Sequence, residues 1–173
     1  MTTRFSELPI DWNPFTICAA GEKAPYPRAL ITKEGLGDRL RFVAFAEKQA
    51  VHAFASAAMI YETAPPAVRE LWLKLSREEE KHLGMLLARM KELEVSVSER
   101  PQSLALWQSF DKCSTALEFA DFMANAEDRG RQGGEKFHET LLKIDPISAE
   151  IFRKIAEEEV EHIRLADQVL ALL

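Results

Sequence analysis

The chain repeats itself, because a series of largely polar residues recurs without a gap 80 positions further along. The matching pairs are Glu47 and Glu127, Pro66 and Pro146, Glu70 and Glu150, Lys74 and Lys154, Glu79 and Glu159, and His82 and His162. Packing alone would repeat apolar residues. A repeat carried by polar positions therefore indicates two equivalent halves that share a chemical role as well as an architecture.

Each half has the periodicity of two helices. Apolar residues spaced by three and four predict helices over residues 34–61, 66–93, 115–142 and 146–173. Pro66 and Pro146 open the second helix of each half. The helices within a half are joined by few residues and should form antiparallel hairpins, whereas about 20 residues, with a short helix near 104–110, separate the halves and can cross a bundle. We predict an all-α fold, a four-helix bundle of two repeated antiparallel hairpins with a crossover connection.

The first 32 residues have a different character. They hold four of the eight prolines, and they also contain Trp12, Phe15 and Tyr26. We expect an irregular N-terminal arm over residues 1–32, lying on the surface of a bundle domain that covers residues 33–173. The chain is long enough for one such domain with a full core.

Composition excludes several classes of protein. The net charge of −6 and the lack of a basic stripe argue against nucleic-acid binding. No apolar run approaches the length of a membrane span, and charges and prolines interrupt residues 1–15, unlike a signal peptide. Cys18 and Cys113 are far apart, which suggests reduced thiols in a cytoplasmic protein and excludes a four-cysteine iron–sulfur or rubredoxin-type module.

Two Glu-x-x-His motifs are the strongest chemical signal. Glu79 and His82, like Glu159 and His162, are three residues apart, so each pair lies on one helix face within reach of one ion. A single copy of this motif is common and usually belongs to a solvated face. Two copies in register favour a metal site.

Two further glutamates fall in register with these motifs. Glu47 and Glu127 each interrupt an apolar stripe, where a charge is costly unless it is paired or bound to metal. All four glutamates lie at a similar depth in their helices, so they should converge near the middle of the bundle. The predicted metal ligands are Glu47, Glu79, His82, Glu127, Glu159 and His162. Glu78 and Glu158 are weaker candidates, because they fit the core stripe less well.

The ligand types indicate which metal to expect. Four carboxylates balance the charge of two divalent ions, and mixed carboxylate and imidazole ligands suit iron or manganese. A structural zinc site would favour thiolates. We therefore expect two iron ions, with manganese as the other metal that these ligands allow.

Over residues 34–173 the sequence resembles the rubrerythrin-like branch of the ferritin-like superfamily. The resemblance rests on Glu47, on the two Glu-Glu-x-x-His motifs at 78–82 and 158–162, and on Glu127. It implies a di-iron site, a reaction with peroxide or dioxygen, and often a homodimer. Residues 49–50 and 127–130 are also similar to an uncharacterised ferritin-like family related to tRNA-modifying hydroxylases.

The sequence departs from rubrerythrins in two respects. It has no rubredoxin-type module, so a separate electron donor protein is expected. Its tyrosines are Tyr26 and Tyr61, and Tyr61 lies about 21 Å along its helix from Glu47, so no tyrosine is predicted beside the metals.

The function that we predict is a di-iron (or di-manganese) oxidoreductase that reacts with peroxide or dioxygen. Ala50 and Gly130, each three residues after a predicted ligand, would leave room for such a small oxidant. A non-catalytic iron-binding or storage protein stays open as an alternative. So does a hydroxylase of a modified nucleoside, against which the acidic charge argues. No catalytic residue beyond the metal ligands is predicted.

Overall fold

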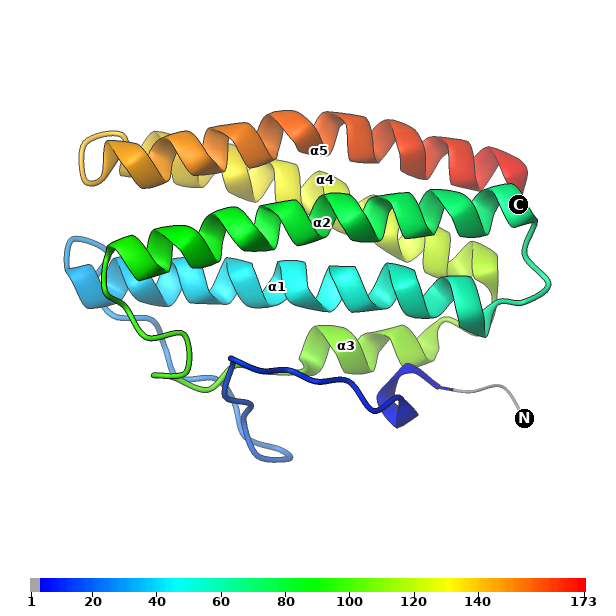
Figure 1. The fold of residues 1–173 in the computed structure, drawn as a ribbon, viewed down its shortest axis with the longest axis horizontal. Helices are drawn as coiled ribbons and strands as arrows, with labels where there is room; N and C mark the ends of the chain where they lie inside the picture. Colours follow the sequence, from blue (N-terminus) through cyan, green and yellow to red (C-terminus); the bar gives the residue numbers. More distant parts are fainter. Residues whose placement is uncertain (1–3) are drawn as a thin grey trace. The chain divides into compact units, whose positions relative to one another are not determined.

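The computed structural model describes residues 4–173, and this part of the chain is all helical (Figure 1). Its helices are α1 (Lys33–Ile60), α2 (Pro66–Glu92), α3 (Ala105–Ser109), α4 (Ala116–Leu141) and α5 (Pro146–Leu172), with short 3-10 helices η1 (Phe5–Glu7) and η2 (Phe110–Lys112). Within residues 4–173 the one extended pairing is an isolated bridge between Ile17 and Gln102. The predicted helices are thus confirmed to within a few residues at each end.

Local signals explain where the helices begin. The Thr32 hydroxyl accepts a hydrogen bond from the Gly35 amide at 3.0 Å, which caps the first turn of α1. Pro66 and Pro146 are the first residues of α2 and α5. Thr115 caps α4 by accepting a hydrogen bond from the Glu118 amide.

Both predicted hairpins are present and antiparallel. In the first, the Ser76 hydroxyl on α2 donates to the Val51 carbonyl on α1 at 2.9 Å. Nearer the turn of that hairpin, the ring of Tyr61 lies 5.9 Å from the ring of Trp72. In the second hairpin, α4 and α5 pack against each other and diverge away from their connection (Figure 1).

The chain forms two compact units, and each is described by itself. Unit 1 comprises Met1–Ala53 and Ser76–Asp111, and unit 2 comprises Phe54–Leu75 and Lys112–Leu173. Each unit therefore takes in a part of α1 and a part of α2. The paired helices within them are consistent with a helical bundle.

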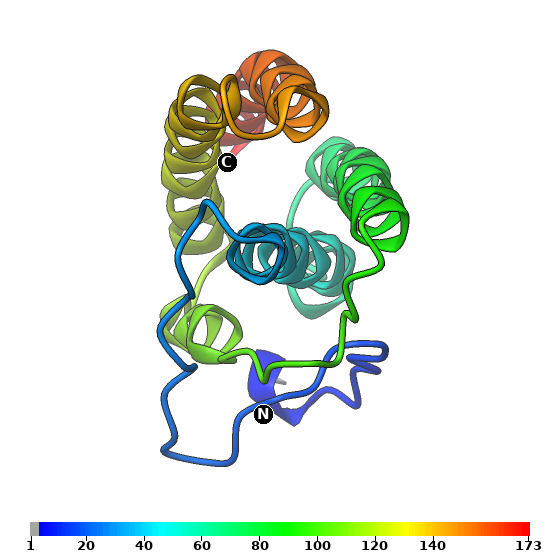
Figure 2. The same ribbon diagram turned by 90° about the vertical axis from the view of Figure 1, so that its left-hand side faces the viewer.

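In unit 1 the N-terminal arm packs through aromatic rings. The Trp12 ring lies 5.6 Å from Phe45 on α1 and 5.2 Å from Trp107 on α3, in both cases edge to face. The Phe5 ring makes a similar contact with Trp107 at 5.5 Å. Figure 2 shows the arm beside α3. These contacts hold the N-terminal arm against α1 and α3. Aromatic pairs contribute stability beyond that of the apolar area that they bury.

A buried ion network fixes the first turns of α1 in the same unit. The Arg41 guanidinium is fully buried and bonds the Asp38 carboxylate at 2.9 Å and the Ser96 carbonyl at 2.6 Å. Burial alone would raise the pKa of Asp38, but hydrogen bonds from Arg28 and Arg41 and the charge of Arg100 hold it well below its usual range. Asp38 therefore stays ionised in the folded protein.

In unit 2 an aromatic cluster joins three helices. The Phe119 ring on α4 lies 5.5 Å from Trp72 on α2 and 6.2 Å from Phe54 on α1. Further along the second hairpin, Phe137 stacks on Phe152 at 4.9 Å. The ring separations in the Phe119 cluster and in the Phe137–Phe152 pair suit aromatic packing. These contacts therefore help to fix α4 and α5.

Among residues 4–173, no helix combines the length and the apolar character that crossing a membrane would require.

Candidate metal centre

On α2, in unit 1, Glu79 and His82 form an adjacent pair. Nδ1 of His82 lies 3.4 Å from Oε2 of Glu79, as expected for residues one turn apart. Glu79 is 1% exposed and His82 is fully buried. The Glu-x-x-His motif of the first half therefore faces the interior, as predicted.

On α5, in unit 2, the matching pair has the same geometry and a further neighbour. Nδ1 of His162 lies 3.3 Å from Oε2 of Glu159. It also lies 3.4 Å from Oε2 of Glu127, which α4 contributes. All three side chains are buried, so α4 and α5 together bring two carboxylates to one imidazole.

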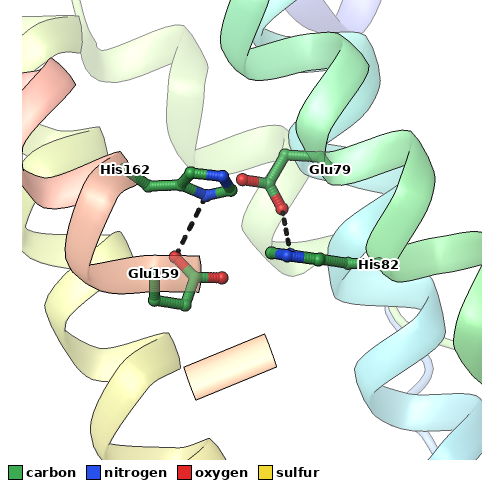
Figure 3. A group of neighbouring side chains, drawn as sticks. All are labelled: Glu79, His82, Glu159 and His162. Atoms are coloured by element: carbon green, nitrogen blue, oxygen red, sulfur yellow. Dashed lines mark ion pairs between the residues drawn. The ribbon is translucent and has the colours of Figure 1, made fainter. Parts of the chain in front are cut away.

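Four of these side chains form one buried group, shown in Figure 3. Glu79, His82, Glu159 and His162 each offer one ligand atom, and these atoms all lie within 4.8 Å of one another. Figure 3 shows the carboxylates and rings pointing toward one another. Ligand atoms at such separations can be drawn onto a shared ion, so this group can hold a metal ion.

The two remaining predicted ligands lie outside that group of four. Glu127 is 5% exposed and reaches His162, as described above. Glu47 is 9% exposed and lies near the middle of α1, in a stretch that also buries Ala44 and Phe45. Both are therefore buried carboxylates, as the sequence predicts.

The electrostatics of these residues favour a cation. Burying a carboxylate costs several kcal/mol unless a positive partner offsets the loss of hydration. Imidazole is a base whose neutral form binds metals through a ring nitrogen. A cation placed among the carboxylates would offset their charge while the imidazoles bind it as neutral ligands.

The neighbouring glutamates show which carboxylate of each motif faces inward. Glu78 pairs with Lys81 at 2.5 Å, where the lysine is largely exposed, and Glu158 is exposed. Glu79 and Glu159 are both buried. The preference for the second glutamate of each motif as a ligand agrees with this burial.

His52 and His138 make packing and backbone contacts instead. The His52 ring packs edge to face on Trp12 at 5.5 Å. Burial lowers the pKa of His52, as does the charge of Lys48, so it favours the neutral form. Nδ1 of His138 lies 3.0 Å from the Ala149 carbonyl, a contact between α4 and α5. Neither histidine belongs to the group of four.

Tyr61 and the two cysteines are not members of the group of four. The Tyr61 hydroxyl donates to the Cys113 carbonyl at 2.7 Å, and so it is engaged at the end of α1. Cys18 and Cys113 form no disulfide.

Sequence reasoning assigned no structural role to Gln49. This residue is 3% exposed, and its side-chain oxygen accepts a hydrogen bond from the Trp107 amide at 2.9 Å. Its nitrogen donates to the Phe45 carbonyl at 3.3 Å. Gln49 thus fixes α3 against α1 two residues beyond Glu47. The feature of the sequence that could have revealed this role is an amide side chain within the apolar stripe of α1.

Comparison with known proteins places the chain in a family. Neither the curated proteins nor the solved structures that were searched gave a match. The family described as "Protein of unknown function (DUF455)" matches residues 13–172, which is nearly the whole chain. The match covers both hairpins and every residue of the candidate metal centre. The chain belongs to this family.

Proposed function

We propose that this protein is an oxidoreductase with a two-metal centre, di-iron or di-manganese, in a ferritin-like four-helix bundle, and that it reacts with peroxide or dioxygen. The observation that carries the proposal is the buried group of Glu79, His82, Glu159 and His162. Two carboxylates and two imidazoles, all buried, form a donor set for a transition metal.

The donor set fits iron or manganese better than zinc. No cysteine belongs to the group of four, whereas structural zinc sites favour thiolates. With Glu47 and Glu127 included, four carboxylates would balance the charge of two divalent ions. We infer that these two residues complete the centre.

The placement of these residues on the helices supports a ferritin-like centre. In such bundles two helices each contribute one Glu, and the other two each contribute a Glu-x-x-His motif. Here α1 carries Glu47 and α4 carries Glu127. The two motifs lie on α2 and α5. The offset of 80 residues between the halves makes each helix of one hairpin the counterpart of a helix in the other.

Two ferrous ions would supply the chemistry. Held by these residues, the two ions would supply the two electrons that, with two protons, reduce hydrogen peroxide to two molecules of water. A separate electron donor protein would then return two electrons. The carboxylates hold the ions, and the burial of the four side chains limits contact with bulk water.

A reaction with oxidant tests this proposal. Protein loaded anaerobically with ferrous iron is mixed with hydrogen peroxide, and absorbance in the near ultraviolet is followed. We expect rapid oxidation in the wild type and in Glu78→Gln, because the Glu78 carboxylate is partly exposed and pairs with the largely exposed Lys81. Glu79→Gln should lose the reaction.

Mass measurement of the same sample separates the proposal from iron storage. We expect a small particle with two ions per chain, on the ligand count given above. A slow reaction, an equal reaction in Glu79→Gln, or a large hollow assembly with many irons per chain would contradict the proposal.

A further inference from the structure

Gly130 on α4 lies between solvent and a buried carboxylate of the candidate centre. The residue is exposed, yet a Cβ atom added to it would lie 3.9 Å from Oε1 and 4.0 Å from Cδ of Glu159. Glu159 itself is only 3% exposed. The backbone of the exposed Gly130 therefore lies close to the buried Glu159 carboxylate.

On either side of Gly130, α4 is packed against α5. One turn before it, buried Glu127 reaches His162. One turn after it, a Cβ on Gly134 would lie 3.1 Å from Cβ of Ala156 and 3.3 Å from the Phe152 carbonyl. At Gly130, between these two contacts, α4 presents no side chain to Glu159 on α5.

Tight packing does not explain this glycine. It explains Gly134, because a side chain there would press on the backbone and Cβ of α5. At Gly130 the nearest atoms would be at ordinary van der Waals distance, so alanine would fit. Glycine is the poorest helix former after proline, and its presence at an exposed helical position runs against local propensity.

We propose that Gly130 is the port through which a small oxidant reaches the metal centre, and that it limits the size of the molecule admitted. The inference rests on the proposed function and specifies its substrate class: hydrogen peroxide or dioxygen rather than a bulky organic hydroperoxide. A longer side chain at this position can cover the Glu159 carboxylate, because its Cβ would already be in van der Waals contact with that group.

Substitutions at Gly130 test the port, and Gly133 provides a matched control. A Cβ on Gly133 meets no atom within 4 Å, so Gly133→Leu adds the same side chain to the same helix away from Glu159. The variants are Gly130→Ala, Gly130→Leu and Gly133→Leu. Iron content and melting temperature are measured first, and both Gly130 variants should keep the iron and the fold of the wild type.

Two measurements then report how readily small molecules reach the metal centre. The first is binding of azide to the oxidised iron form, followed by its visible absorption. The second is the rate of oxidation of the ferrous form by hydrogen peroxide and by tert-butyl hydroperoxide. For Gly130→Leu we expect the rate of azide binding and both oxidation rates to fall by about tenfold or more, the scale on which a pocket rejects a few added methylenes. The azide affinity at equilibrium should stay unchanged, because a blocked port slows entry and exit alike.

Gly130→Ala should slow tert-butyl hydroperoxide more than hydrogen peroxide, and Gly133→Leu should behave as the wild type. Wild-type rates of azide binding and of oxidation in Gly130→Leu, with iron content unchanged, would overturn the port while leaving the two-metal centre intact. Equal losses in Gly133→Leu would also overturn it, because the effect would not depend on the position facing Glu159. A wild-type protein that binds no iron would overturn the proposed function and the port together.

Discussion

At the residue scale, burial separates ligand candidates that the sequence alone leaves adjacent. Glu158 and Glu159 are neighbours of identical chemistry, yet the first is exposed and the second is 3% exposed. The helical period causes this difference, because successive residues point about 100° apart. The spacing of three residues to His162 and the position on the core stripe were therefore enough to choose Glu159 from the sequence.

The first prediction concerns the two histidines of the repeat. His82 and His162 are buried alike, and each lies one turn from a glutamate at nearly the same distance. His82→Ala and His162→Ala should therefore lower the bound metal by similar amounts, each to about one ion per chain or fewer, because each removes an equivalent ligand. Elemental analysis after anaerobic loading with ferrous iron measures this.

His138→Ala is the control for that experiment. Its ring contacts a backbone carbonyl and does not belong to the buried group, so the variant should retain the metal content of the wild type. If one of the two substitutions empties the site and the other changes nothing, the halves of the repeat are not equivalent in metal binding.

At the scale of helices, local signals predicted the elements and long-range contacts escaped prediction. Proline at the start of α2 and α5 and the Thr115 cap of α4 act within one turn, so the sequence reveals them. The burial of Arg41 depends on carbonyls more than 50 positions away, and no local pattern signals it. The hydrogen bond from the Trp107 amide to Gln49 is missed for the same reason.

The second prediction compares two adjacent glycines of α4. A leucine at Gly134 would have to displace Ala156 and the Phe152 carbonyl, so Gly134→Leu should lower the free energy of unfolding by about 2 kcal/mol. Gly133 has open space, so Gly133→Leu should raise it by up to about 1 kcal/mol through helix propensity. Urea unfolding in the presence of a chelator measures both without a contribution from bound metal.

If the two leucine variants have the same stability, the close approach of α4 and α5 at Gly134 is not a determinant of the fold. If Gly133→Leu is the less stable one, the packed face of α4 is assigned wrongly.

At the scale of the whole molecule, the repeat accounts for architecture and chemistry together. Each half supplies one antiparallel hairpin, one buried stripe glutamate and one buried Glu-x-x-His motif. The sequence predicted the helices, both hairpins and the burial of all six candidate ligands. It could not predict how the arm packs, because the contacts of Trp12 with Phe45 and Trp107 join residues distant in the chain.

The central claim is that one chain holds two metal ions through these six residues, and metal counting tests it most directly. The wild type, Glu159→Gln and Glu158→Gln are loaded with ferrous iron under anaerobic conditions, freed of excess metal and analysed for iron per chain. We predict about two ions in the wild type and in Glu158→Gln, and clearly fewer in Glu159→Gln, because the proposed centre takes only the buried carboxylate as a ligand. One ion or none in the wild type, or equal iron in both variants, would contradict the two-metal centre.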